Sequence, residues 1–366
     1  MTQIDLAATP QATAFAELLE SAATPHRLVP YRGVLTPQEL DAPIAESEAL
    51  ANGAAGHDLG WLKRVAVRGE DRFRWLSGMV TNMVSDLGEN GGAWNLVLNA
   101  QGRIQGDLTV WREGDQLEIE IAADQYDRLL AHLDRFIIMD DVELVPLSGD
   151  AALGLTGPQV HEVLARVGLP TLSEPMTFTR VEWNGMDLRI AREYGAAAAH
   201  YVLWAPEAQL GKLWMYLRTA GAIPVGSASL DAFRIAEGIP GYGIDMAERD
   251  LPQETSQLRA LNFSKGCYLG QEIVERIRSR GNVHKHLRQL ELFGPVPAAG
   301  TGLGLDGGTV GGAITSAAEL PLASGSRVFA LAMMRAEAEQ RNEPFNYDVG
   351  ADAGTARILA APPSFR

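Results

Sequence analysis

The sequence of 366 residues predicts an α+β fold, with mixed antiparallel α/β subdomains followed by a small C-terminal β-barrel. Short segments of alternating apolar and polar residues are joined by tight turns, which favours antiparallel pairing over a doubly wound parallel sheet. Hydrophobic residues make up 46% of the chain and charged residues 21%, a composition typical of globular proteins. Because the chain is too long for one ordinary core, we expect two or three domains.

The elements of the first half follow from the periodicity of the apolar residues. Residues 1–50 are predicted to form an N-terminal extension with one short helix, from Phe15 to Ser21. Helices are also expected over 70–80 and 129–137, where apolar residues recur every three or four positions. Alternation predicts strands around residues 65–67, 94–98, 103–111, 117–121 and 142–144.

From about Leu153, the second half repeats this order of strand, helix and hairpin. We therefore divide a core domain, 51–288, into two subdomains at 51–150 and 151–288. Helices are predicted over 158–167 and from Pro206 to Leu217, and Asn184-Gly185 predicts a hairpin. After residue 288, short apolar segments separated by Gly and Pro predict a β-barrel over 289–366.

Charge and composition restrict the partners. The net charge of −15 argues against a general nucleic-acid binder, which needs a basic surface. No apolar run approaches the ~20 residues of a membrane helix. The first 25 residues carry three carboxylates and no Lys or Arg, unlike a signal peptide or a mitochondrial presequence. We expect a cytoplasmic protein with no membrane partner and no direct nucleic-acid partner.

Two motifs favour an ordinary structural interpretation. Residues 302–307 fit G-x-G-x-x-G, but they lie among strand-like segments with no helix after them, so we interpret the glycines as turn residues. His284 and His286 would share one face of a strand, and a metal site there is conceivable. Two histidines without a third ligand make a poor site, so we expect no intrinsic metal.

The segment around the single cysteine, Cys267, is the strongest candidate for chemistry. A helix is predicted from Gly270 or Gln271 to just before Gly281. Cys267 would lie directly before this helix and two residues after Lys265, and both features favour the thiolate. The alternative is a small buried apolar cysteine.

The same region is basic. Residues 265–288 contain six Lys or Arg and two Glu, a local charge of +4 in an acidic protein. Such an island could bind an anionic ligand or an acidic partner. Equally, it could be a solvated helix face with pairs such as Glu272–Arg276.

Residues 265–272, Lys-Gly-Cys-Tyr-Leu-Gly-Gln-Glu, resemble the signature K-G-C-Y-x-G-Q-E of the YgfZ-type folate-binding proteins. That family is related to the glycine-cleavage aminomethyltransferase (T-protein) and includes mitochondrial iron–sulfur assembly factors. The similarity extends over the chain from about Leu59. It includes Thr81-Asn82 and the segments 98–104, 238–240, 251–254, 263–264 and 310–316.

The resemblance implies a three-domain α+β ring around a channel that holds tetrahydrofolate. It also implies a role in maturing or repairing iron–sulfur proteins, with indirect effects on tRNA modification, and partners among iron–sulfur assembly or client proteins. Cys267 would be the reactive centre; since one thiolate cannot hold a cluster, the other ligands must come from elsewhere. The expected folate contacts are Asn82, Arg234, Glu237, Lys265, Tyr268, Gln271 and Glu272.

The sequence departs from the transferase at three places. Of its Asp-Asp pair, only Asp107 could supply the acid. Its acidic pterin-contacting loop corresponds to residues 195–201, which contain no carboxylate. Its R-x-E-x-G element is present with the Glu shifted by one, at Glu237. We therefore expect weak tetrahydrofolate binding by an iron–sulfur accessory protein. The alternatives are a folate-dependent aminomethyl transferase and a structural scaffold with a buried Cys267.

Overall fold

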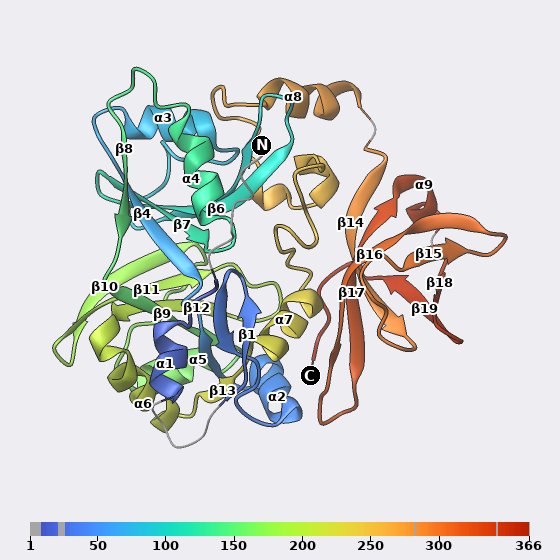
Figure 1. Cartoon of the computed structure of the whole chain (residues 1–366), viewed down its shortest axis with the longest axis horizontal. Helices are drawn as coiled ribbons and strands as arrows, with labels where there is room; N and C mark the ends of the chain where they lie inside the picture. Colours follow the sequence, from blue (N-terminus) through green and yellow to red (C-terminus); the bar gives the residue numbers. More distant parts are fainter. Residues whose placement is uncertain (1–8, 21–25, 282, 342, 366) are drawn as a thin grey trace.

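The computed structural model describes residues 9–20, 26–281, 283–341 and 343–365. Figure 1 shows two large sheets, one above the other, beside a barrel formed by the C-terminal part of the chain. A small hairpin of β1 (Leu28–Tyr31) and β2 (Val34–Pro37) lies near the second sheet. The predicted α+β fold with a C-terminal β-barrel is confirmed.

The first sheet is antiparallel, with the strand order β5-β6-β7-β4-β8. Apolar residues of its strands pack against α3 (Arg72–Met79) and α4 (Tyr126–Asp134), as the periodicity predicts. The strands are β4 (Leu62–Arg68), β5 (Gly92–Leu98), β6 (Ile104–Glu113), β7 (Gln116–Ala122) and β8 (Glu143–Leu147).

The second sheet has the order β10-β11-β12-β9-β3-β13, and β13 pairs in parallel with β3. Its core contains residues of α1 (Ala14–Glu20), α5 (Val160–Arg166) and α6 (Leu210–Thr219). The Asn184-Gly185 hairpin forms as predicted, between β10 and β11. The strands are β3 (Ala55–Asp58), β9 (Asp150–Thr156), β10 (Thr177–Trp183), β11 (Met186–Glu193), β12 (His200–Pro206) and β13 (Ile223–Val225).

The barrel is closed, in the order β14-β17-β16-β15-β18-β19. Its connection to the second sheet is made by α2 (Pro43–Asn52) and α7 (Ser227–Ala236), which share an apolar cluster with β14 and β17. A short helix, α9 (Ala336–Glu339), follows β17. The strands are β14 (Lys285–Phe293), β15 (Gly302–Leu305), β16 (Thr309–Leu320), β17 (Arg327–Arg335), β18 (Phe345–Val349) and β19 (Asp352–Ile358).

The described part of the proposed N-terminal extension packs into the main body. Phe15 of α1 and Leu50 of α2 are 1% and 0% exposed, each within a core cluster. The helix predicted from Phe15 to Ser21 is confirmed as α1 up to Glu20; Ser21 lies outside the described residues. The domain boundaries themselves stay a prediction.

A long connection joins α7 to the barrel. It contains two short 3-10 turns, η2 (Pro252–Thr255) and η3 (Leu258–Ala260), and then α8 (Gln271–Arg280), which lies at the top of the molecule in Figure 1. Gly270 precedes α8 with φ +82°, and a Cβ atom there would lie 2.6 Å from the Asn99 carbonyl oxygen. The predicted helix start at Gly270 or Gln271 is therefore confirmed, and only glycine fits the turn before it.

The two motifs given a structural interpretation lie at the barrel strands, and of the three motif glycines only Gly307 is a turn residue. Gly302 and Gly304 belong to β15, and Gly307 and Gly308 form the turn into β16, so no helix follows them. His286 is the second residue of β14 and contacts Glu339 at 3.1 Å, whereas His284 precedes the strand. Within the described part of the chain, no three His, Cys, Asp or Glu side chains are grouped to hold a metal ion. None of the described helices has the length and apolar character needed to cross a membrane.

Candidate functional site

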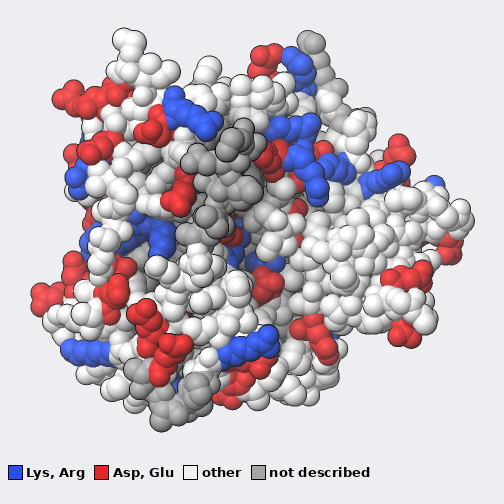
Figure 2. Space-filling view, in the orientation of Figure 1, with Lys and Arg blue, Asp and Glu red and all other residues white. Residues whose placement is uncertain are grey.

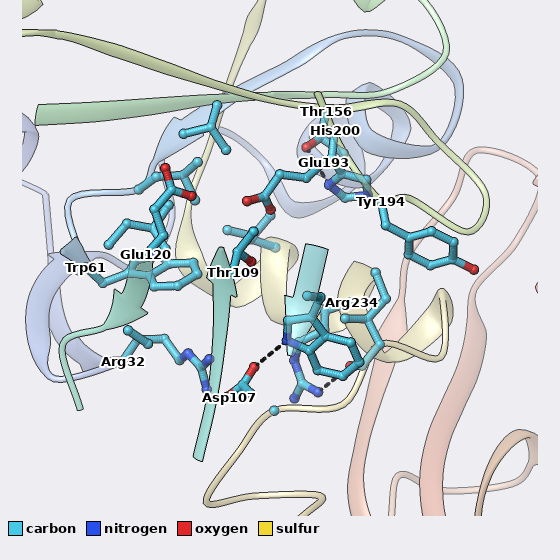
Figure 3. A pocket seen from close by; sticks show the side chains of 18 of the residues that line it. Arg32, Trp61, Asp107, Thr109, Glu120, Thr156, Glu193, Tyr194, His200 and Arg234 are labelled. Atoms are coloured by element: carbon cyan, nitrogen blue, oxygen red, sulfur yellow. Dashed lines mark hydrogen bonds between the residues drawn. The ribbon is translucent and has the colours of Figure 1, made fainter. Parts of the chain in front are cut away.

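A cavity of about 220 Å³ lies between the two large sheets, against α7. The first sheet contributes Trp94 of β5, Asp107 and Thr109 of β6, and Glu120 of β7; the second contributes His57, Thr156, Glu193 and His200. Figure 3 shows the polar side chains of the two sheets facing one another across this space. The cavity is therefore the best candidate for a ligand site.

Glu120 is a buried carboxylate in the wall of the cavity. Alternation along β7 turns Leu117, Ile119 and Ile121 toward the helices, so Glu120 points to the other face, where the second sheet covers it. Its Oε1 accepts hydrogen bonds from Arg189 Nη1 at 2.8 Å and Trp204 Nε1 at 3.0 Å. Its Oε2 is buried and has no partner among the described residues.

A second carboxyl group, of Glu193 at the end of β11, lies in the same cavity. Burial, together with the negative charge of Glu120, raises the pKa of Glu193 to about 7. No described residue forms a hydrogen bond with this carboxyl group. Glu120 and Glu193 thus both lie in the cavity, each with a carboxyl oxygen available to a ligand.

A chain of hydrogen bonds crosses the opposite wall. Glu237 Oε2 lies 2.6 Å from His200 Nε2, and His200 Nδ1 lies 3.1 Å from the Thr156 hydroxyl. That hydroxyl lies 3.0 Å from His57 Nε2. His57 fits there because its partner in β9 is Gly154, where a Cβ atom would overlap the imidazole ring.

The protonation states of the residues in this hydrogen-bond chain follow from burial and neighbouring charges. Burial, followed by the charge of His200, lowers the pKa of His57 to about 3, so His57 is neutral. Burial opposes a charge on His200 and on Glu237, but their mutual attraction outweighs it: the pKa of His200 is raised and that of Glu237 is lowered. The wall therefore holds one buried charged pair and one neutral imidazole.

Glu237 also organises the loop that follows β11. Its Oε1 accepts hydrogen bonds from the backbone N–H groups of Ala197 at 2.7 Å and Ala198 at 3.0 Å. Residues 195–201 contain no carboxylate, and Glu120 and Glu193 now supply carboxyl groups from the strands instead. The strength of tetrahydrofolate binding stays a prediction.

Asp107, the predicted acid, is held by two hydrogen bonds inside the cavity. Oδ2 accepts from Trp94 Nε1 at 2.9 Å, and Oδ1 accepts from Gln125 Nε2 at 2.8 Å. A dashed line in Figure 3 joins Asp107 to the indole nitrogen. Both oxygens are thus fixed by neutral donors, so the carboxylate is positioned but not paired with a cation.

Two unpartnered donors complement the carboxyl groups. Arg234 donates to Asp231 and Asp245 at 2.8 and 2.6 Å, and its Nη2 is buried without a partner among the described residues. Trp61 Nε1 is likewise buried and unpartnered. Since both residues line the cavity, it offers donors as well as acceptors to a ligand.

Three of the nine predicted site residues line the cavity, namely Asp107, Arg234 and Glu237. The other six lie elsewhere in the described chain. Asn82 donates its amide to the carbonyl groups of Trp94 and Arg259, which joins β5 to η3. Lys265 Nζ donates to the carbonyl groups of residues 77, 80 and 82 at the end of α3. All three ammonium donors are used there, so Lys265 contributes no hydrogen bond to a Cys267 thiolate.

The rest of the Cys267 segment forms a turn and a helix start. Tyr268 is buried in an apolar cluster, and its backbone N–H donates to Gln271 Oε1 at 3.3 Å. Glu272 forms the expected surface pair with Arg276 at 2.7 Å. Cys267 itself is exposed, which excludes the buried apolar cysteine considered above.

The surface around α8 carries much of the visible positive charge. Figure 2 shows Lys and Arg side chains gathered near α8 and the start of β14, while acidic residues are spread over the rest of that face. Arg276 and Arg278 are both paired, with Glu272 and Glu275. These pairs are those of a solvated helix face; an acidic partner for this surface stays a prediction.

Sequence reasoning missed the polar residues that complete the cavity: Trp61, His57, Glu120, Glu193, His200 and Arg259. The alternation of Leu117, Ile119 and Ile121 with Glu118 and Glu120 was visible, but it is also typical of a strand with one face in water. Only the placement of the second sheet over that face distinguishes the two cases.

Comparison with known proteins gives one consistent family. The family model described as the GCVT N-terminal domain matches residues 20–265. An aminomethyltransferase of Rubrobacter xylanophilus is 29% identical over 272 residues, 73% of each chain. One from a Nostoc strain is 24% identical over 92% of this chain and 91% of its own. A putative chloroplastic transferase of Arabidopsis thaliana is 24% identical over 72% of this chain and 62% of its own.

The fold is similar to that of a solved structure along almost the whole chain. The crystal structure of glycine cleavage system aminomethyltransferase T from Bartonella henselae superposes with a TM-score of 0.83. It covers 97% of this chain and 98% of its own, at 18% sequence identity. This likeness shows the fold, including the barrel.

Proposed function

The chain belongs to the family of the GCVT N-terminal domain, and we propose that it binds a reduced folate in the cavity between its two large sheets. The resemblance of residues 265–272 to the YgfZ-type signature and the likeness to aminomethyltransferases support this proposal. When bound, tetrahydrofolate supplies nitrogen atoms that carry one-carbon units.

The observation that carries the proposal is the unpartnered, buried Oε2 of Glu120. A buried acceptor without a partner is unfavourable by about 1–3 kcal/mol, so a ligand that donates to it gains affinity. The pterin ring of a folate carries an amino group and a neighbouring ring N–H, which suit Glu120 and Glu193. Its ring carbonyl group suits the unpartnered donors of Trp61 and Arg234.

Calorimetric titration with tetrahydrofolate tests this fit. The wild-type protein should give saturable heat, and Glu193→Gln should bind about tenfold more weakly because it loses an ionisable acceptor. Glu193 has no hydrogen bond to other described residues, so the variant should keep its melting temperature. Glu272→Gln, on the surface of α8, is the matched control and should bind like the wild type. Equal affinity of all three proteins would contradict the proposal.

We further propose that Cys267 acts in the maturation or repair of iron–sulfur proteins in the cytoplasm. The support is the specific match of residues 265–272 together with the exposure of the thiol on the turn before α8. One thiolate cannot supply the ligands of a cluster, so an assembly or client protein would contribute the others. Effects on tRNA modification would then be indirect.

Substitution of the cysteine distinguishes this role from a structural one. Cys267→Ser and Cys267→Ala should both fold with an unchanged melting temperature, because the side chain is exposed. Neither should restore iron–sulfur enzyme activity in cells that lack the native protein. Full restoration by both variants at equal expression would leave Cys267 without a role in this function.

Aminomethyl transfer is the second candidate function, and the position of Asp107 in the cavity favours it. Against it, a single carboxylate replaces the pair of the transferase, and both of its oxygens are held by neutral donors. We expect turnover near background with an aminomethylated lipoyl carrier, since general acid–base catalysis contributes ~10²–10⁴-fold. Robust turnover that Asp107→Asn abolishes would establish the transferase.

A further inference from the structure

Arg259 lies in the wall of the cavity between two aromatic rings. The centre of its guanidinium group is 4.3 Å from the ring centroid of Trp94 and 4.0 Å from that of Tyr194. Tyr194 is 39% exposed, so this part of the wall lies where the cavity meets solvent. Stacking of this kind fixes the plane of a guanidinium group and leaves its edge free for hydrogen bonds.

The rest of the residue is also fixed. Its Nε donates to Gln257 Oε1 at 3.1 Å, and its backbone carbonyl group accepts a hydrogen bond from Asn82 Nδ2 at 2.8 Å. The two terminal nitrogens have no hydrogen-bond partner among the described residues, and Arg259 forms no ion pair with a described carboxylate. The result is a positioned cation whose planar edge is unused.

We propose that Arg259 forms an anion subsite that binds a carboxylate of the ligand through its two terminal nitrogens. The planar fork of a guanidinium group matches a carboxylate in a bidentate arrangement. The inference rests on the proposed function: in a reduced folate, the matching group is a carboxylate of the glutamate tail. The cavity then recognises two parts of one molecule, a donor-rich ring at Glu120 and Glu193 and an anion at Arg259.

The acidic residues of the cavity do not neutralise the charge of Arg259 by direct pairing. Glu193, Asp107 and Glu237 are near enough to favour its charged form, but burial outweighs them and lowers the pKa of Arg259 to about 10. The guanidinium group is still charged at neutral pH. A counter-charge that reached its edge directly would replace the hydration that burial removes.

The test compares tetrahydrofolate with its diamide, in which both tail carboxylates are carboxamides of nearly the same shape. The third probe is 6-methyltetrahydropterin, which has the reduced pterin ring but no glutamate tail. The wild-type protein should bind tetrahydrofolate at least about tenfold more tightly than the diamide, the range of a charge-assisted pair. Arg259→Gln should remove this preference and leave the affinity for 6-methyltetrahydropterin unchanged, which also shows that the variant is folded. Arg259→Lys keeps the positive charge but not the planar fork. Its preference for tetrahydrofolate over the diamide should lie between those of the wild type and Arg259→Gln.

Arg128→Gln is the matched control. Arg128 also stacks on an aromatic ring, 5.1 Å from the centroid of Tyr242, but it does not line the cavity. This variant should keep the wild-type preference. If wild type binds 6-methyltetrahydropterin but binds tetrahydrofolate and its diamide equally, or if Arg259→Gln keeps the preference, the anion subsite is refuted while the folate site stands. Binding of none of the three probes would overturn both.

Discussion

Glu237 Oε2 and His200 Nε2 lie 2.6 Å apart in the wall of the cavity, and both side chains are largely withdrawn from solvent. One carboxylate therefore does two things: it pairs with the imidazole on β12 and holds the backbone of Ala197 and Ala198. The loop after β11 and the hydrogen-bond chain to His57 depend on this pair.

Glu237→Gln should destabilise the protein clearly. The amide can still accept from the two backbone N–H groups, but it loses its charge, so the stability loss should be about 2 kcal/mol, as for a hydrogen bond between charged groups. Glu272→Gln is the control, because its exposed pair with Arg276 is worth about 0.3–0.5 kcal/mol. Denaturant unfolding measures both. Equal losses of unfolding free energy in the two variants would show that the buried pair stabilises the protein no more than the exposed pair does.

The contribution of His200 should depend on pH in one direction. Its pKa is raised in the folded protein, so the stability that it adds is fully present below the unfolded value of about 6.5 and is lost as pH rises through the raised folded value. The difference in unfolding free energy between wild type and His200→Asn should therefore be larger at pH 6 than at pH 9. A difference that grows toward pH 9 would mean that His200 is neutral when folded.

Ligand affinity should also depend on pH, through Glu193. The pKa of this carboxyl group is about 7, and its ionised form is the stronger acceptor for a ring N–H. Tetrahydrofolate should therefore bind more tightly as pH rises from 6 to 8, by at most about tenfold per unit for one proton. Glu193→Gln should give a flat profile over this range. A slope that persists in the variant would belong to another group, and Glu193 would not be the acceptor.

Lys265 should act as a structural clamp for the Cys267 turn. Its three hydrogen bonds to the end of α3 are lost in Lys265→Met, and we expect a loss of about 2–3 kcal/mol in unfolding free energy. Lys63→Met, at an exposed position near the start of β4, should change stability by no more than about 0.5 kcal/mol. If Lys265→Met is as stable as this control, Lys265 is available for the ligand role first expected of it.

Much of the fold follows from local patterns. The strands that flank Asn184-Gly185 and the start of α8 at Gln271 are predicted from turn chemistry and helical spacing alone. The short strand β3, Ala55–Asp58, has no such signal, since it is buried on both faces and is defined by its partners β9 and β13. The sequence alone therefore predicts no strand there and assigns residues 1–50 to an N-terminal extension.

The site was predictable only in part, because the cavity is made by the packing of one sheet on another. Asp107, Arg234 and Glu237 were found through motifs of a known family. Glu120 and Glu193 lie 73 positions apart in the sequence, and neither belongs to a motif. The two residues share a cavity because the first sheet packs on the second. The periodicity within one strand does not encode this packing.

The most direct test of the account is a crystal structure determined with tetrahydrofolate at saturating concentration. We expect density for the pterin ring in the cavity, with its amino edge within hydrogen-bond distance of Glu120 Oε2 or the Glu193 carboxyl group. Tetrahydrofolate bound only elsewhere, for example beside Cys267, or an empty cavity at saturation would contradict it.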